Sequence, residues 1–304
     1  MKKINLKTNL GRISLKNPIV LASGCFGYGD EYKDLISLDD VGAVVTKTIT
    51  LKPKAGNPPP RVVETASGIL NSIGLANVGA EVFLKEKLPG LLKKFSTPVI
   101  VSIAGETRDE YLKLISLLNR KKIAGIELNI SCPNVGKDLT IGQDEVETFG
   151  LVKAVRKKTN LPLLVKLSPN VTDIGKIAKS AEKAGADILS LVNTFSAIGI
   201  DAETGRAKLG GVLGGLSGPA IKPIALRMVW QVRKTTSLPI IGMGGIANTS
   251  DALEFIITGA NAIGLGSAIF INPDLCREII AGLKRYLSRK RIYNLDKLVG
   301  SLIV

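Results

Sequence analysis

The feature that most constrains this chain is a repeated alternation of short β-branched runs with amphipathic helical patterns. Eight apolar runs begin at Ile19, Ala43, Val99, Gly125, Leu163, Ile188, Pro239 and Ala262. Between them, segments such as 108–122 and 171–186 place apolar residues three and four positions apart, which is typical of amphipathic helices. Strand and helix alternating eight times in 304 residues predict an α/β fold of the (β/α)8 TIM barrel type. A doubly wound open sheet is the alternative.

The barrel is expected to form one domain over residues 1–304. Residues 1–18 precede its first strand, and within them the segment 4–18 alternates apolar and polar residues about a turn at Asn9–Gly11. This pattern predicts an N-terminal β-hairpin that covers the barrel bottom. Two long connections, 50–77 and 195–218, follow strand carboxyl ends, where barrels carry their active sites. We therefore expect both to be active-site loops.

Composition removes several kinds of active site. The chain has no histidine, so the usual zinc site, the Ser-His-Asp triad and the Cys-His pair are all absent. Acid–base chemistry must then use cysteine, lysine, tyrosine or a carboxylate. The three cysteines have no CxxC spacing and are too few to hold an iron–sulfur cluster. Such cysteine usage suggests a reducing, cytoplasmic location.

The charge and hydropathy patterns give no sign of a nucleic-acid or membrane partner. The net charge of +15 comes from dispersed lysines with few aromatic residues among them, which favours a lysine-rich surface over a nucleic-acid site. No apolar segment follows Lys2 and Lys3, so a signal peptide is not expected. The longest uncharged run, 255–273, is interrupted by glycines and predicts a helix end, a turn and a buried strand.

Two glycine clusters end the last two predicted strands. They are Gly242, Gly244 and Gly245, then Gly264 and Gly266 before Ser267. Glycines let backbone N–H groups approach a phosphate closely, although tight turn packing explains either cluster alone about equally well. Both clusters together, after strands seven and eight, predict a phosphorylated ligand or cofactor.

Charged and polar residues also interrupt the predicted strands. Lys47 and Lys166 lie in otherwise apolar runs, and a buried lysine is costly without a partner, so the pair suggests an electron-rich ligand near the barrel axis. In Glu127–Asn134, "ELNISCPN", the apolar Leu128 and Ile130 alternate with polar residues that should face the barrel interior. Cys132 follows at the catalytic face and is the strongest candidate for proton transfer. Cys25 and Cys276 are interpreted as small buried hydrophobes.

With these residues the sequence resembles the dihydroorotate dehydrogenases along nearly its whole length. The motifs "TKTIT", "NSIGLAN", "ELNISCPN", "VKLSPN", "VNTF", "GGLSGPAIKPIALRMVW" and "IIGMGGI" occur in order with the spacing of that family. The resemblance implies a barrel that holds one FMN at its carboxyl-terminal face and oxidises dihydroorotate to orotate in pyrimidine synthesis. It also implies that Cys132 is the base that removes a proton from ring carbon 5 while hydride leaves carbon 6.

The resemblance carries further roles onto individual residues. The implied substrate-binding residues are Lys47, Asn71, Ser72, Ile73, Gly74, Leu75, Asn129, Asn193 and Thr194. The implied FMN-binding residues are Ser23, Lys47, Thr48, Asn129, Lys166, Val192, Gly218, Gly244, Gly245, Gly266 and Ser267, the last four around the phosphate. Ser102 stands where the family often has asparagine, and Ser267 where it tends to have threonine.

The resemblance is strongest to the soluble, NAD-dependent type 1B catalytic subunit. It implies a homodimer core within a heterotetramer, in which a partner subunit carries FAD and a [2Fe-2S] cluster. The fumarate-reducing type 1A is an alternative. From the residues alone, a phosphate-binding barrel synthase or aldolase that uses Lys47 or Lys166 as a Schiff-base amine, and a basic nucleic-acid-binding module, are further alternatives.

Overall fold

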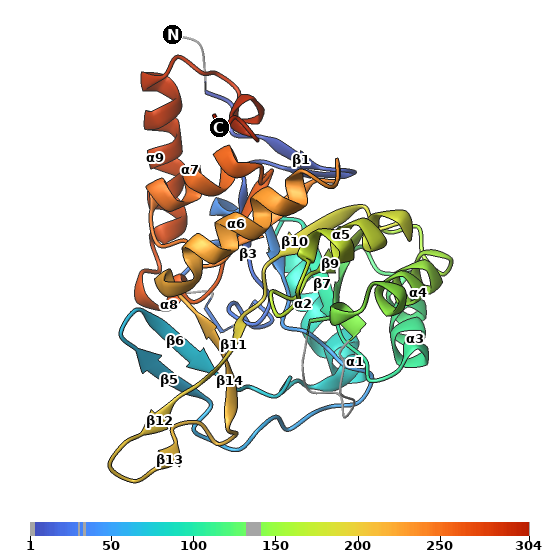
Figure 1. Cartoon of the computed structure of the whole chain (residues 1–304). Coiled ribbons are helices and arrows are strands. Elements are labelled where there is room, and N and C mark those ends of the chain that lie inside the picture. Colours follow the sequence, from blue (N-terminus) through green and yellow to red (C-terminus); the bar gives the residue numbers. More distant parts are fainter. Residues whose placement is uncertain (1–3, 30, 33–34, 132–140, 304) are drawn as a thin grey trace.

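The computed structural model of the chain describes residues 4–29, 31–32, 35–131 and 141–303 (Figure 1). Eight parallel strands close into a barrel in the order β10-β15-β16-β3-β4-β7-β8-β9. The barrel strands are β3 (Ile19–Leu21), β4 (Ala43–Val45), β7 (Val99–Ile103), β8 (Gly125–Asn129), β9 (Leu163–Lys166), β10 (Ile188–Leu191), β15 (Ile240–Met243) and β16 (Ala262–Leu265). The predicted TIM barrel is confirmed, and the open-sheet alternative is wrong.

Helices between these strands form the outer layer. They are α1 (Gly79–Val82), α2 (Leu88–Lys94), α3 (Arg108–Leu118), α4 (Glu145–Arg156), α5 (Ile174–Lys183), α6 (Lys222–Arg233), α7 (Thr249–Thr258), α8 (Ala268–Ile271) and α9 (Leu275–Arg289). A π-helical turn, η2 (Phe83–Lys87), joins α1 to α2. The 3-10 turn η1 (Leu38–Asp40) lies in the connection from β3 to β4. None of the described helices combines the length and apolar character needed to cross a bilayer.

Side-chain caps set several of the helix starts. Asp144 and Asp173 accept hydrogen bonds from backbone N–H groups in the first turns of α4 and α5. Asn248 does the same for α7 by accepting from the Asp251 N–H. Each cap satisfies donors that a helix start leaves open, so the start is specified locally by the sequence.

The N-terminal hairpin closes the end of the barrel opposite the long loops. Strands β1 (Thr8–Leu10) and β2 (Ile13–Leu15) pair antiparallel, with Leu10 opposite Ile13. The turn is therefore Gly11–Arg12, one position later than expected, and Gly11 adopts a left-handed φ of 56°. Leu10, Ile13 and Leu15 are buried against the apolar lower layer of the barrel interior. The predicted cover is confirmed.

The two long connections do more than form separate loops. Strands β5 (Val62–Thr65) and β6 (Gly68–Asn71) come from the first, while β11 (Phe195–Ile198) and β14 (Leu213–Ser217) come from the second. They form one antiparallel sheet in the order β11-β14-β6-β5, and the second connection adds the small pair β12 (Ile200–Asp201) and β13 (Arg206–Ala207). Figure 1 shows this sheet at the lower left, far from the hairpin at the top. The sheet joins two segments that the sequence analysis treated separately.

Candidate active site at the carboxyl end of the barrel

The upper layer of the barrel interior is polar. Below it the interior is filled by apolar side chains such as Ile100, Leu164 and Ile188. In the upper layer, Ser102 and Glu127 are register partners on β7 and β8, and Lys166 and Ser190 are register partners on β9 and β10. All four are buried. The predicted inward orientation of the polar residues of "ELNIS" is confirmed, since Leu128 and Ile130 pack instead in the outer core with the helices.

Both candidate lysines are at the carboxyl end of the barrel. Lys166 is the last residue of β9 and is only 6% exposed. Lys47 is half-buried and lies two residues beyond the end of β4, so its expected position inside a strand is wrong. Across the residues that the structure describes, neither ammonium group has an ion-pair or hydrogen-bond partner. No buried side-chain nitrogen or oxygen among the described residues lacks a hydrogen-bond partner, so both ammonium nitrogens are accessible rather than sealed in the core. An accessible, unpaired cation at this end of the barrel favours a ligand that brings negative charge.

Two asparagines are locked together above this layer. Ser131 Oγ donates to Asn129 Oδ1 over 2.9 Å, and Asn193 Nδ2 donates to Ser131 Oγ over 2.6 Å. Tyr111 from α3 holds the backbone by donating to the Asn129 carbonyl over 3.0 Å. Asn193 Oδ1 in turn accepts from the Thr194 N–H. The ends of β8 and β10 therefore present amides of defined orientation to one space.

A second group of hydroxyls joins Asn129 to the neighbouring strands. Asn129 Nδ2 donates to Thr48 Oγ1 over 3.3 Å. Thr48 Oγ1 is 3.0 Å from Ser23 Oγ and 2.9 Å from Ser102 Oγ. Three of the predicted cofactor and substrate residues, Asn129, Thr48 and Ser23, are thus connected with Ser102, the position where the family pattern departs.

The predicted substrate loop is held by the sheet. Asn71 Nδ2 donates to the Gly215 carbonyl over 2.9 Å, and Ser72 Oγ donates to the Leu213 carbonyl over 3.1 Å. A side chain at Gly215 would lie 2.0 Å from Thr194 Oγ1, so Thr194 closely approaches β14 at this glycine. Gly74 and Leu75 continue the loop with φ of 68° and 54°, and Ile73 accepts from the Asn57 N–H. Asn71, Ser72 and Thr194 therefore all lie against β14.

The glycine clusters divide into two kinds. Gly244 and Gly245 have φ of 129° and 78°, and a Cβ on Gly245 would lie 2.8 Å from the Gly218 carbonyl oxygen. These glycines are required by turn geometry and by close packing. Gly266 has no left-handed φ, and a Cβ there would meet only Cys25 Sγ, at 3.6 Å. The fold does not require glycine at this position, so the open space fits a ligand that approaches the backbone.

The glycines that follow β15 lie beside a lysine. Gly218, Gly245 and Lys222 lie next to one another, since a Cβ on Gly245 would also contact Lys222. Lys222 itself is paired with Asp251 at 2.6 Å and with Glu254 at 3.0 Å. Those contacts raise its pKa, with the Asp251 hydrogen bond as the largest cause. The Lys222 ammonium is therefore engaged by two carboxylates, and a phosphate at this end of the barrel would be bound by backbone N–H groups and by Ser267 at the start of α8.

Two predicted residues need separate mention. Val192 is buried just beyond β10, and its N–H donates to the Met243 carbonyl over 3.1 Å. Cys132 lies outside the described residues, directly after the buried Ser131. The structure therefore places the neighbours of the predicted base but not the base itself.

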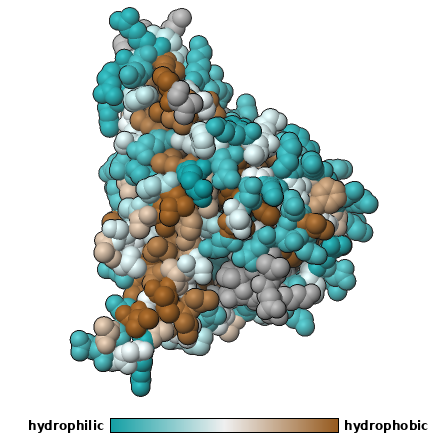
Figure 2. Space-filling view, viewed as in Figure 1, coloured by the Kyte–Doolittle hydropathy of each residue, from teal (hydrophilic) through white to brown (hydrophobic). Residues whose placement is uncertain are grey.

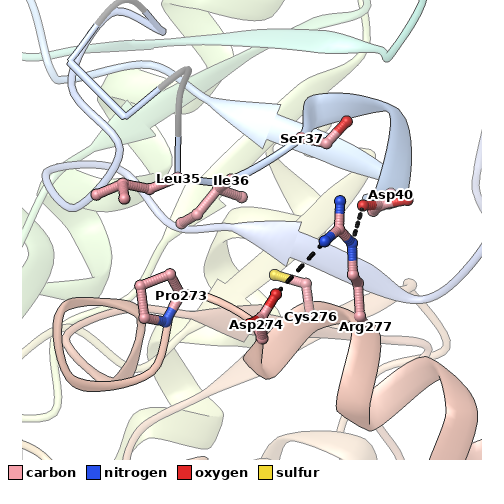
Figure 3. A pocket seen from close by; sticks show the side chains of 8 residues that line it. All are labelled: Leu35, Ile36, Ser37, Asp40, Pro273, Asp274, Cys276 and Arg277. Atoms are coloured by element: carbon pink, nitrogen blue, oxygen red, sulfur yellow. Dashed lines mark hydrogen bonds and ion pairs between the residues drawn. The ribbon is translucent and has the colours of Figure 1, made fainter.

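Cys276 is buried, as expected for a small apolar residue, whereas Cys25 is half-buried, so its interpretation as a buried residue is wrong. Burial raises the pKa of the Cys25 thiol to about 11 and that of Cys276 to about 12. Cys276 lines a cavity of only about 10 Å³ between η1 and α9, where Arg277 pairs with Asp40 at 2.7 Å (Figure 3). That volume is about one water molecule, so the cavity is not a substrate site.

Some residues that lie beneath or beside the site were not predicted from the sequence. Glu127 was recognised only as inward-facing, and Ser190 was not singled out, although both are buried in the upper layer. Asn170 bridges two loops by donating to the Thr194 carbonyl and accepting from the Ser196 N–H. A polar residue within an apolar run was the available signal for Ser190. In the described ranges, no cluster of three or more His, Cys, Asp or Glu side chains could hold a metal ion.

Together these features define a barrel with two lysines and oriented amides at its carboxyl end, the end at which barrel enzymes carry their active sites. A family model described as "Dihydroorotate dehydrogenase" matches residues 5–287, so the chain belongs to the dihydroorotate dehydrogenase family. A protein from Desulforamulus reducens is 50% identical over 301 residues, covering 98% of this chain and 99% of its own length. One from Geotalea daltonii is 48% identical over 304 residues, covering 99% of each chain. Both are named dihydroorotate dehydrogenase B (NAD(+)), catalytic subunit.

Proposed function

We propose that this chain is the catalytic subunit of an NAD-dependent dihydroorotate dehydrogenase, which oxidises (S)-dihydroorotate to orotate in the synthesis of UMP. The supporting observation is the unpartnered, buried Lys166 beside the oriented amides of Asn129 and Asn193. A cation and fixed hydrogen-bonding groups at one end of the barrel suit an electron-rich ring and a carboxylate. The full-length similarity to named catalytic subunits supports the same activity.

FMN suits the site and would supply the acceptor for the hydride. The residues proposed to hold it are Ser23, Lys47, Thr48, Asn129, Lys166, Val192, Gly218, Gly244, Gly245, Gly266 and Ser267. The open space at Gly266 supports the phosphate position, and the uncompensated charge of Lys166 supports contact with the electron-rich part of the ring. Lys166 would stabilise negative charge that develops on that ring during the reaction.

The substrate would lie between this layer and the loop that follows β6. Asn71, Ser72, Ile73, Gly74 and Leu75 are proposed to enclose it, with Lys47, Asn129, Asn193 and Thr194 as polar contacts. The amide orientations of Asn129 and Asn193 are set by Ser131, so these side chains need no rearrangement to bind. Preorganised groups of this kind lower the entropic cost of reaching the reactive geometry.

Cys132 is proposed as the catalytic base. A thiolate there would take the proton from ring carbon 5 while the hydride leaves carbon 6, so that the double bond of orotate forms between them. The absence of histidine and the position directly after Ser131 support this assignment. A cysteine thiol has an ordinary pKa of about 8.5, which nearby cations such as lysine lower.

We further propose that the chain works in the cytoplasm as a homodimer bound to a subunit that carries FAD and a [2Fe-2S] cluster. Exposed apolar side chains on and beside the β11-β14-β6-β5 sheet support an interface there; they are Val62, Ile198, Ile200, Val212 and Leu213. Figure 2 shows apolar surface on the lower left of the molecule, where Figure 1 draws this sheet. Apolar patches of this kind commonly mark protein contacts.

Anaerobic addition of dihydroorotate to the purified yellow chain tests the proposal. Bleaching of the flavin absorbance is expected, with little NAD reduction until the partner subunit is supplied. Efficient fumarate reduction by the isolated chain would instead indicate type 1A. A colourless protein that borohydride traps with a carbonyl substrate would indicate an aldolase that uses Lys47 or Lys166.

A further inference from the structure

The barrel interior holds a buried carboxylate that the reaction does not use directly. Glu127 is 1% exposed, and within the described part of the chain it has no cationic partner within ion-pair distance. Among the described residues, its hydrogen-bond donors are two fully buried hydroxyls: Ser102 Oγ lies 3.2 Å from Oε1 and Ser190 Oγ lies 2.8 Å from Oε2. An apolar side chain would fill this interior position without the desolvation cost of a carboxylate. The carboxylate therefore requires an explanation beyond packing.

The hydroxyl protons near Glu127 can be assigned by counting. A carboxylate only accepts, so Ser102 must donate its single hydroxyl proton to Glu127. Ser102 Oγ can then only accept from Thr48 Oγ1, which lies 2.9 Å away. Since Thr48 has now used its proton, it can only accept from Ser23 Oγ at 3.0 Å. The hydroxyl protons of Ser23, Thr48 and Ser102 therefore all point toward Glu127.

This direction determines what the outer residues offer a ligand. Thr48 Oγ1 donates to Ser102 and accepts from Ser23 and from Asn129 Nδ2. Its hydroxyl therefore cannot form a further hydrogen bond to a ligand. Ser23 is half-buried at the open end and presents only lone pairs. Because Thr48 must accept from Asn129, the amide of Asn129 is held with Nδ2 toward Thr48 and Oδ1 toward Ser131.

We propose that Glu127 is a positioning residue that sets the direction in which the hydroxyls of Ser102, Thr48 and Ser23 donate. Ser23 thereby becomes a hydrogen-bond acceptor for the flavin, and the Asn129 amide is held in a fixed orientation toward the flavin. The inference rests on the proposed function, because the ligand of Ser23 and Asn129 is taken to be FMN. Glu127 also adds a buried negative charge to the same interior layer as Lys166. It acts through Ser102 and Thr48 and does not touch the ligand.

The matched pair Ser102→Ala and Ser190→Ala tests the proposal. Each variant removes one fully buried hydroxyl that donates to Glu127, but only Ser102 connects the carboxylate to Thr48. In Ser102→Ala the Thr48 proton is free to turn toward Ser23, whose own proton then points at the ligand. We expect the dissociation constant of FMN, measured by fluorescence on the flavin-free protein, to rise roughly 3- to 10-fold in Ser102→Ala and less than 2-fold in Ser190→Ala.

Two further variants separate positioning from folding. In Ser102→Asn an amide can donate to Glu127 and accept from Thr48 at once, so FMN affinity should recover relative to Ser102→Ala. In Glu127→Gln the negative charge is lost while the shape is kept, so the midpoint potential of the bound flavin should rise. Thermal melts of the flavin-free variants report any general loss of stability.

Equal changes in FMN affinity for Ser102→Ala and Ser190→Ala would overturn the proposal, as would an unchanged potential in Glu127→Gln. Failure of the proposed function looks different. In that case the wild-type chain binds no FMN, or its bound flavin is not bleached by dihydroorotate, and the first of these results overturns the positioning role as well.

Discussion

Replacement of Lys166 by Met separates the cost of this side chain to the fold from its value to the cofactor. Lys166 is only 6% exposed as a residue. Its ammonium has no ion-pair or hydrogen-bond partner in the described part of the chain. Methionine is similar in length, fills the same space and carries no charge. An unpaired cation in a dry interior costs on the order of several kcal/mol. The Lys166 ammonium nitrogen is accessible, because no buried side-chain nitrogen among the described residues lacks a partner, so water in the flavin-free site recovers part of this cost. We therefore expect Lys166→Met to raise the free energy of unfolding of the flavin-free protein by about 1–3 kcal/mol.

The same change should weaken cofactor binding. A hydrogen bond to a charged group contributes about 1.5–3 kcal/mol, which corresponds to a roughly 10- to 150-fold higher dissociation constant for FMN. Urea unfolding of the flavin-free protein and fluorescence titration with FMN measure the two effects separately. Lys176→Met, on the exposed face of α5, is the control and should change both quantities little. A flavin-free Lys166→Met protein that is less stable than wild type, with unchanged FMN affinity, would refute the reasoning.

Three other predictions address the base, the phosphate site and the buried thiols. Cys132→Ala should retain FMN, whereas stopped-flow reduction of the flavin by dihydroorotate should slow by roughly 10²- to 10⁴-fold; an unchanged rate would remove Cys132 from the mechanism. Gly266→Ala should melt within a few degrees of wild type, because a Cβ meets only Cys25 Sγ at 3.6 Å, yet bind FMN several-fold more weakly; full affinity would move the phosphate elsewhere. Burial raises the pKa of Cys276 from 9.0 to about 12, so between these pH values the thiol is ionised in the unfolded chain but protonated in the folded one. The free energy of unfolding should therefore fall as the pH rises from 9.0 to about 12. Cys276→Ala should lessen that fall, and identical pH profiles for the two proteins would contradict the assignment.

Much of the architecture follows from local patterns. Eight apolar runs separated by amphipathic segments favoured a parallel barrel over an open sheet, and the alternation in 4–18 predicted the hairpin that covers it. The inward direction of Glu127 and Asn129, with Leu128 facing the helices, follows from the two-residue period of a strand. These properties depend on residues that are close along the chain, so periodicity is sufficient to predict them.

The site was predictable only in part. Motif resemblance supplied residues such as Lys166, Asn193 and Gly266, and the structure brings them to one end of the barrel. Local propensity placed Lys47 inside a strand, whereas β4 ends at Val45. Strand ends depend on how far the neighbouring strands continue to pair, which a single run of residues does not encode.

The sequence by itself determined the order of strands and helices, the hairpin, the inward-facing residues and, through its motifs, the family. Only the tertiary structure decided that the two long connections form a single sheet, in which Asn71 bonds a carbonyl 144 positions away. Only the tertiary structure likewise decided that Glu127 receives the hydroxyls of Ser102 and Ser190 from two other strands. Closure of the barrel is the physical reason, because it brings together side chains whose separation along the chain leaves no periodic trace in the sequence.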